Sequence, residues 1–272
     1  MQIAGRNISE ELTIKTNFVC NYLVSFLKEK FEELGFSKAV IGISGGVDSA
    51  VSATLAVRAL GKDNVLGLIL PYKTTAPENI EDAKIIIGKL GIAHSQIEIT
   101  KVVDSYCEEY SVTDKVRRGN IMARVRMIIL YDFSAQEKAL VIGTGNKSEA
   151  LMGYGTLHGD LACAINPIGD LYKSQVWMLA EELEIPEKVI GKTPTADLWQ
   201  GQTDEGELGI KYELLDEILY KLYDKCLTKP EMIKLGYDAA TLDKIIDRVS
   251  KNEFKRRPPI IPQLPTEAWL NK

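Results

Sequence analysis

The six residues from Ser44 to Ser49 read Ser-Gly-Gly-Val-Asp-Ser and combine two hydroxyls, a carboxylate and a glycine pair. A β-branched run at residues 39–43 precedes them and predicts a buried strand, and residues 49–60 predict a helix. Glycines let the backbone approach a ligand closely, and a helix start directs N–H groups and a positive dipole at an anion. This stretch therefore predicts a phosphate-binding site. It matches neither Gly-x-x-x-x-Gly-Lys-Ser/Thr nor Gly-x-Gly-x-x-Gly, which excludes the two commonest nucleotide-binding loops.

The same six residues resemble the pyrophosphate loop of the ATP-pyrophosphatase superfamily. Its members activate a carboxylate or carbonyl by transferring AMP to it, with pyrophosphate leaving. The resemblance implies that Ser44, Ser49 and the loop amides hold the departing pyrophosphate. It also implies that Asp48 holds a Mg²⁺ ion, which prefers oxygen ligands. The alternative is an ordinary glycine-rich turn in which an Asp or Ser side chain caps the helix.

A second polar cluster follows another predicted strand, at residues 140–143. The run from Thr144 to Glu149 reads Thr-Gly-Asn-Lys-Ser-Glu and brings hydroxyls, a lysine and a carboxylate to the end of that strand. Glu149 is the expected second Mg²⁺ ligand, and the alternative is a first-turn glutamate favoured by the helix dipole. In the predicted helix at residues 115–133, Asn120 and Arg124 lie one turn apart on one face. Its arginines predict either a solvated basic face or contacts with an anionic ligand: Arg117, Arg118, Arg124 and Arg126.

The elements that position these clusters alternate between strand and helix. Apolar residues at three- and four-residue steps from Leu12 to Leu34, Phe18 and Tyr22 among them, predict one long packing helix that ends at Gly35. Further strands are predicted at residues 65–70 and 95–99, and further helices at 78–90, 212–223 and 239–250. The pattern predicts an α/β fold: a doubly wound, Rossmann-like parallel sheet with helices on both faces and N- and C-terminal helical additions. Ligands of such sheets bind at the carboxyl ends of the strands, where both clusters lie.

Composition limits the class of protein. The chain has 272 residues, 45% of them hydrophobic, which is enough for one large domain with a full core. A net charge of −5 argues against a protein that mainly coats nucleic acid. The four cysteines are widely spaced without a Cys-x-x-Cys pair, which predicts free thiols in a reducing cytoplasm. No stretch approaches the ~18 apolar residues of a membrane span and no signal peptide is recognisable, so a soluble cytoplasmic protein is expected.

Six further segments occur in the order found in NAD synthetases, and the likeness runs from about Lys15 to Pro259. They include Gly-Tyr-Gly-Thr-Leu-His-Gly-Asp at residues 153–160 and Pro-Thr-Ala-Asp-Leu-Trp at residues 194–199, and the others lie at residues 118–124, 143–149, 166–168 and 170–176. Their order separates this family from GMP, asparagine and tRNA lysidine synthetases. The resemblance implies one NAD synthetase domain over residues 1–272, which amidates nicotinic acid adenine dinucleotide (deamido-NAD). The products would be NAD, AMP and pyrophosphate, formed with ATP and ammonia through an acyl adenylate.

The resemblance also implies roles for individual residues around ATP. Asp48 and Glu149 match the Mg²⁺ ligands of the family. Catalysis is assigned to Asp48, Ser49 and Lys173, where Lys173 acts as a point charge for phosphates. The matching ATP-binding positions are Gly42, Ile43, Ser44, Gly45, Gly46, Val47, Asp48, Ser49, Thr144, Lys173 and Thr195.

The expected contacts with deamido-NAD are Arg124, Asp160 and Lys255. Three positions depart from the best-known bacterial pattern, so the dinucleotide pocket is expected to be lined differently: Leu157, Ala164 and Phe254. Family resemblance implies a homodimer, with the helix at residues 115–133 or the N-terminal helix as candidate interface. No nucleic acid or membrane partner is expected.

Two further expectations concern the loops and the nitrogen donor. Residues 199–209 contain three glycines and three acidic residues without apolar periodicity, which predicts a mobile loop. The family resemblance implies that a loop at this place closes over the site. Glutamine-dependent members carry an amidase domain ahead of the synthetase, and only about forty residues precede the pyrophosphate loop here. Use of free ammonia, without a glutaminase domain, is therefore expected.

Two other functions stay open from the sequence. One is another pyrophosphate-loop adenylating ligase or a tRNA-modifying enzyme, which would use the arginines at residues 118–126 and the basic turn at 255–259. The other is a nucleotide-binding sensor without turnover. Release of AMP that depends on deamido-NAD separates these from an NAD synthetase.

Overall fold

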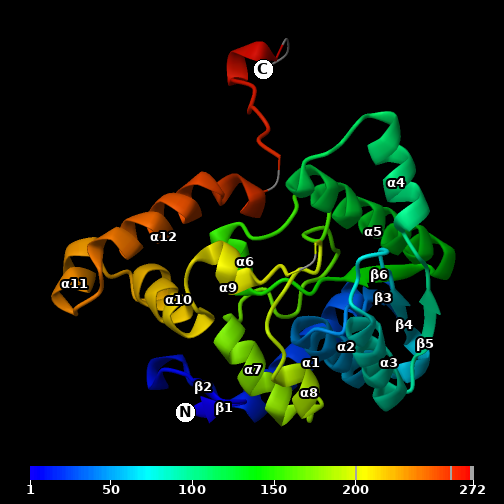
Figure 1. Ribbon diagram of the computed structural model, residues 1–272, viewed down its shortest axis with the longest axis horizontal. Helices are drawn as coiled ribbons and strands as arrows, with labels where there is room; N and C mark the ends of the chain where they lie inside the picture. Colours follow the sequence, from blue (N-terminus) through cyan, green and yellow to red (C-terminus); the bar gives the residue numbers. More distant parts are fainter. Residues whose placement is uncertain (200, 258, 270–272) are drawn as a thin grey trace.

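Four parallel strands form the central sheet, in the order β5-β4-β3-β6 (Figure 1). They are β3 (Lys38–Gly42), β4 (Val65–Ile69), β5 (Ala93–Gln96) and β6 (Ala139–Ile142). In the register of the sheet, Val40 of β3 lies opposite Leu66 of β4 and Val141 of β6. The structure is a computed structural model that describes residues 1–199, 201–257 and 259–269. A short antiparallel hairpin of β1 (Gln2–Ile3) and β2 (Arg6–Asn7) lies near the N-terminus.

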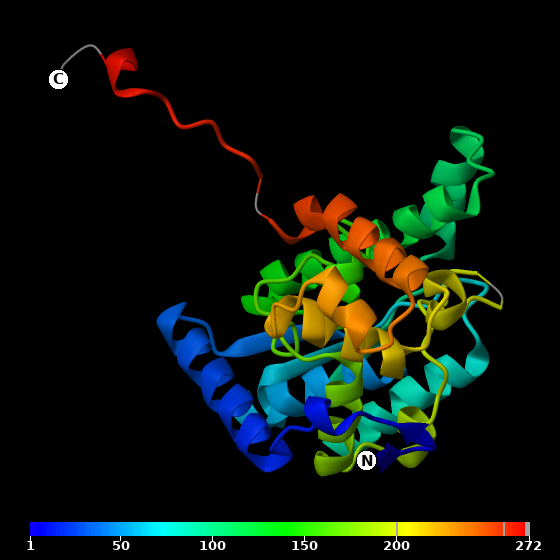
Figure 2. The same ribbon diagram turned by 90° about the vertical axis from the view of Figure 1, so that its left-hand side faces the viewer.

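Helices connect the strands, and the regular elements after β6 are helical in the described part of the chain. They are α1 (Thr16–Glu33), α2 (Val47–Leu60), α3 (Pro77–Leu90), α4 (Thr100–Glu109), α5 (Lys115–Glu137), α6 (Lys147–Met152), α7 (Lys173–Glu182), α8 (Glu187–Ile190), α9 (Asp204–Leu208), α10 (Tyr212–Leu219), α11 (Lys229–Lys234) and α12 (Ala239–Lys251). None of the helices in the described ranges is both long enough and apolar enough to cross a membrane. Residues 259–269 run away from the remainder of the chain (Figure 2).

Side chains along the central strands alternate between two apolar layers. Ala39 and Ile41 of β3 belong to the larger core, which also contains buried residues of α1, α2 and α7. Val40 of β3 faces the opposite way, toward Val103 of α4 and Met122 of α5. Both faces of the parallel sheet are therefore covered by helices. The predicted α/β fold class is confirmed.

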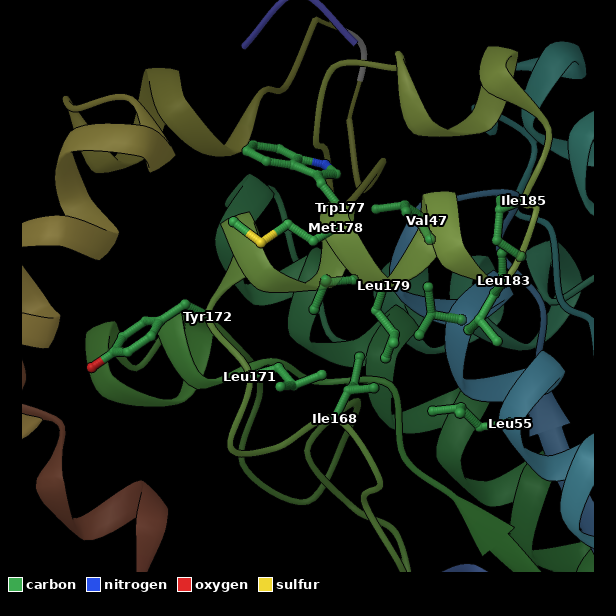
Figure 3. Packing of buried hydrophobic residues seen from close by; sticks show 14 of the residues in the cluster. Val47, Leu55, Ile168, Leu171, Tyr172, Trp177, Met178, Leu179, Leu183 and Ile185 are labelled. Carbon is green, nitrogen blue, oxygen red and sulfur yellow. The ribbon is translucent and has the colours of Figure 1, made fainter. Parts of the chain in front are cut away.

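Helix α7 links the sheet layer to the C-terminal helices. Trp177 and Leu179 of α7 share an apolar cluster with Val47 and Leu55 of α2 (Figure 3). Helix α7 also contacts α10, and α10 contacts α6. This packing holds the starts of α2, α6 and α7 close together, beyond the carboxyl ends of β3 and β6.

Some predicted boundaries are wrong. The N-terminal helix begins at Thr16 instead of Leu12, because residues 10–12 form a separate 3₁₀ turn. The packing predicted for Phe18 and Tyr22 is also wrong. Their exposed fractions are 67% and 61%, because the buried stripe of α1 follows another face of the helix. The strand predicted at 95–99 is β5 at 93–96, and Ile99 packs in the core just before α4 instead.

Candidate active site

The predicted phosphate loop joins β3 to α2, which begins two residues earlier than predicted. Gly45 has φ +82°, and a Cβ at this position would lie 2.2 Å from the carbonyl oxygen of Asn79, so only glycine fits. The Ser49 hydroxyl donates to the Gly46 carbonyl at 2.9 Å and accepts from the Ser44 amide at 3.3 Å. The first amides of α2 have no acceptor in the described part of the chain. They are the donors that a helix start offers to an anion.

Lys173, at the start of α7, is the centre of a charge cluster. Its exposed fraction is 2%, and Nζ donates to Oδ2 of Asp48. The other Asp48 oxygen, Oδ1, accepts from Nδ2 of Asn146 at 3.1 Å. The charges of Glu149 and Asp204 also act on the Lys173 ammonium. The alternative in which Asp48 caps α2 is wrong, because its carboxylate bonds to other helices instead of to amides of its own.

The cluster shifts the ionisation of its members. Burial alone would lower the pKa of Lys173, but the nearby carboxylates, led by Asp48, outweigh burial and raise it. Burial and then the Asp48 charge raise the pKa of Glu149 well above its usual value, against the effect of the Lys173 ammonium. Burial likewise raises the pKa of Asp204. One ammonium therefore faces three carboxylates, a charge balance that favours binding of an additional cation.

Asp48 and Glu149 suit the Mg²⁺ ion that the family resemblance implies. No three His, Cys, Asp or Glu side chains in the described ranges form a group that could hold a metal ion. The two carboxylates therefore fit an ion that also binds phosphate oxygens and water, as Mg²⁺ does at nucleotide sites. Glu149 Oε2 also accepts from the amide of Asn146 at 3.2 Å in a capping box, so the helix-start alternative for Glu149 holds as well.

A cavity of 690 Å³ joins the phosphate loop, the charge cluster and the predicted substrate contacts. All the predicted ATP-binding positions except Gly45 line it, Thr144 and Thr195 included. Asp160 and Lys255 also line it, and Lys255 Nζ donates to two backbone carbonyls at 2.8 and 2.9 Å. Its volume is in the usual range for small-molecule sites. Residues far apart in the sequence therefore form one nucleotide-sized site.

Arg124 and Arg126 of α5 differ in their position relative to the cavity. Residues two apart on a helix occupy different faces. Arg124 donates to the carbonyl of Leu157 at 3.2 Å and does not line the cavity, so its contact with deamido-NAD stays a prediction. Arg126 lines the cavity, and its Nε donates to the carbonyl of Leu70 at 3.0 Å. In the described part of the chain, no carboxylate forms an ion pair with Arg126. A half-buried guanidinium of this kind fits an anionic ligand.

The predicted mobile loop at 199–209 is a loop only in its first half. Helix α9 forms the second half, where the Thr203 hydroxyl caps the helix by accepting from the Gly206 amide at 3.2 Å. A Thr at the N-cap followed by acidic residues favours the start of a helix. The prediction of a loop gave more weight to the three glycines than to this signal. Gln200 lies outside the described residues. Gln202 and Asp204 are buried and line the cavity, so this segment forms one wall of the site.

Asn146 and Asp204 belong to the site but were not assigned from the sequence, and Arg126 was named only as one of four possible contacts with an anionic ligand. Asn146 lies inside the second polar cluster, but nothing in the sequence indicates that its amide reaches Asp48. Arg126 lies one helical turn after the buried Met122, and this spacing could have indicated that Arg126 points toward the interior. Asp204 is one of three acidic residues in its segment, and only the fold distinguishes it from the other two.

Comparison with known proteins agrees with this geometry. The family model described as NAD synthase matches residues 19–259. The NH(3)-dependent NAD(+) synthetase of Chlorobium phaeobacteroides (strain BS1) is 47% identical over 242 residues, which cover 89% of this chain and 87% of that protein. The chain belongs to the NAD synthase family.

Two solved structures are similar over nearly the whole chain. The NMN synthetase of Francisella tularensis has 34% identity and a TM-score of 0.83, covering 93% of this chain and 100% of that one. The NH3-dependent NAD synthetase of Campylobacter jejuni subsp. jejuni NCTC 11168, in complex with the nitrate ion, has 37% identity and a TM-score of 0.79. This second match covers 92% of this chain and 100% of that one.

Proposed function

We propose that this protein is an ammonia-dependent NAD synthetase. It amidates deamido-NAD with ATP and ammonia and releases NAD, AMP and pyrophosphate. Membership of the family supports the reaction class. The observation that carries the proposal is the single cavity in which the phosphate loop, the Lys173 ammonium and the carboxylates of Asp48 and Glu149 meet. Amide donors and a buried cation lie where a pyrophosphate would be held.

The first chemical step activates the carboxylate of the substrate. A carboxylate does not react with ammonia at neutral pH, because its carbon is electron-rich and its oxygen leaves poorly. An oxygen of the nicotinate carboxylate attacks the α-phosphorus of ATP, and the bond from that phosphorus to the pyrophosphate oxygen breaks. The hydroxyls of Ser44 and Ser49, the first amides of α2 and the Lys173 ammonium stabilise the leaving pyrophosphate.

The second step is displacement of AMP. Ammonia attacks the acyl carbon, the bond from that carbon to the AMP oxygen breaks, and a proton is released as the amide forms. Positioning and electrostatics suffice for both steps, so no nucleophilic side chain is needed. Asp48 and Glu149 would hold Mg²⁺, which when bound neutralises part of the phosphate charge.

We assign the dinucleotide contacts to Arg124, Asp160 and Lys255.

Arg124 lies on the same face of α5 as the exposed Ile128 and Tyr131, one and two turns further along the helix. An apolar exposed face of this kind supports the proposed homodimer, in which Arg124 would lie near a second copy. Sedimentation of the protein at two concentrations tests this, and a monomer at both would contradict it.

The likeness to an NMN synthetase keeps a second candidate open, amidation of nicotinic acid mononucleotide. Release of AMP should be measured with each of the two substrates at saturating ammonia. We expect kcat/KM for deamido-NAD to exceed that for the mononucleotide by about tenfold or more. The reverse preference would support the second candidate. Absence of AMP with both substrates would instead favour another ligase or a sensor.

Free ammonia is the proposed nitrogen donor. With glutamine that has been freed of contaminating ammonia, turnover should fall to a small fraction of the rate with ammonium chloride. Comparable rates with the two donors would overturn this assignment.

Leu198 and Trp199, which line the cavity, should pack against α5 only if the α5 residue that they contact is small. A Cβ at Gly119 would lie 3.0 Å from Leu198 and 3.5 Å from the Trp199 ring, and Lys115 Nζ lies 4.9 Å from the centroid of that ring. Gly119→Val should therefore raise the KM of ATP by about tenfold, because this wall can no longer dock and exclude water. Gly88→Val is the matched control, since apart from the local backbone of α3 no atom lies within 4 Å of a Cβ there. Equal KM values in both variants would contradict docking.

Arg126 should bind an anionic group of a substrate. Arg126→Leu should raise the KM of ATP or of deamido-NAD by about tenfold or more, because the cavity loses one of its guanidinium groups. Arg126→Lys should recover only part of this effect, since it keeps the charge but loses the planar fork. Unchanged KM values for both substrates in the leucine variant would show that Arg126 is structural.

A further inference from the structure

Asp216, on α10, is a buried carboxylate behind the active site. Its exposed fraction is 0%, and it does not line the cavity. Oδ1 accepts from the hydroxyl of Ser148 at 2.5 Å, and Oδ2 accepts from both the amide and the hydroxyl of Ser174 at 2.7 Å. Within the described ranges it forms no ion pair, although a buried charge usually does. Its hydrogen-bond partners lie at the starts of two helices, α6 and α7.

These two helix starts carry two of the charges of the active site, those of Glu149 and Lys173. Ser148 precedes Glu149 on α6, and Ser174 follows Lys173 on α7. The Ser148 hydroxyl also accepts from the amide of Lys173 at 2.9 Å. Asp216 therefore satisfies the first two amides of α7, one directly and one through Ser148. It ties the backbone that carries Lys173 to the backbone that carries Glu149.

We propose that Asp216 is a positioning residue for the adenylation step. Through Ser148 and Ser174 it fixes the start of α7 against α6, so that the Lys173 ammonium stays beside Asp48. This inference rests on the proposed function of the site. Asp216 does not touch the substrate, and it acts only through the placement of Lys173. A displacement of about 1 Å at a reacting centre can lower a rate about a hundredfold.

A purely structural role explains the charge of Asp216 poorly. Burial raises the pKa of Asp216 to about 6, while the bonds from Ser148 and Ser174 and the Lys173 charge act in the opposite direction. The titratable groups around it are Lys173, Tyr172 and Tyr212. Because its pKa is higher in the folded than in the unfolded chain, the contribution of Asp216 to the free energy of unfolding falls as the pH rises from about 4 to about 6. At neutral pH the ionised carboxylate is therefore less favourable for folding than its protonated form would be.

Asp216→Asn separates the two roles, because it keeps the shape of the side chain and removes the charge. We expect kcat for AMP formation to fall about tenfold or more, the KM of ATP to change less than about threefold, and Tm at pH 7.5 to stay the same or rise. Glu217→Gln is the matched control on the same helix, since its carboxylate bonds to the hydroxyl of Tyr237 and not to α6 or α7. This control should keep the wild-type kcat.

The outcomes decide between the roles. A wild-type kcat in Asp216→Asn, or a joint loss of kcat and Tm, would overturn the inference. If this variant does not fold, Ser148→Ala decides, because it removes the acceptor of the Lys173 amide. A lowered kcat with an unchanged Tm in Ser148→Ala supports positioning, and a normal kcat or a joint loss of kcat and Tm contradicts it. Failure of the proposed function would look different, since the wild-type protein would then release no AMP with deamido-NAD.

Discussion

Asp48→Asn should lower the rate of AMP formation by about a hundredfold or more and leave the protein folded. The neutral amide keeps the shape of the side chain but removes the charge that holds the Lys173 ammonium and would bind Mg²⁺. The main effect should be weaker stabilisation of the leaving pyrophosphate in the adenylation step. The measurement is the initial rate of AMP release, with circular dichroism to verify the fold.

A matched substitution shows what the loss of a charged capping residue alone does to the rate. Asp114 is a true capping residue, which accepts from the Arg117 amide at 2.7 Å at the start of α5. Asp114→Asn should leave the rate within about threefold of wild type, since asparagine also caps helices well. Similar rates in the Asp48 and Asp114 variants would contradict the role assigned to Asp48.

Lys173→Met should lower kcat by at least about a hundredfold as well. Methionine keeps much of the length and apolar volume of the lysine side chain, but it leaves the carboxylates of Asp48, Glu149 and Asp204 without their ammonium. Removal of one partner of a buried ion pair is also destabilising, so Tm should fall. Initial rates and thermal unfolding curves test both parts of the prediction.

Lys147→Met is the control for this second substitution. Lys147 is also largely buried and ion-paired, with Asp224 at 2.6 Å and Asp170 at 2.9 Å, but it does not line the cavity. Its loss should lower Tm and leave kcat within about threefold. If both lysine variants lost activity only in proportion to their stability, Lys173 would have no chemical role.

Features that depend on local sequence were predictable. The glycine pair, the following Asp and the flanking strand and helix define the phosphate loop, because the steric limit at Gly45 and the helix start both arise within a few residues. The alternation of strands and helices likewise predicts the covered parallel sheet. The expected cluster of polar residues beyond β3 and β6 follows from the geometry of parallel strands.

Features that depend on distant contacts were not predictable. The pairs of Asp48 with Asn146 and Lys173 join residues 98 and 125 positions apart. The burial of Asp204 depends on how its segment packs, and no periodicity in the sequence indicates it. Arg124 and Arg126 are the same residue type, so only the orientation of α5 against the sheet decides which one lines the cavity.

Transfer of oxygen from the substrate carboxylate to AMP tests the central claim most directly. Deamido-NAD labelled with ¹⁸O in the nicotinate carboxylate should be incubated with ATP, ammonia and the enzyme, and the products analysed by mass spectrometry. Since the carboxylate oxygen bonds to the α-phosphorus and leaves with it, we predict one ¹⁸O atom in each AMP released and one in the NAD amide. Formation of ADP, or ¹⁸O in inorganic phosphate with unlabelled AMP, would contradict adenylation at this site.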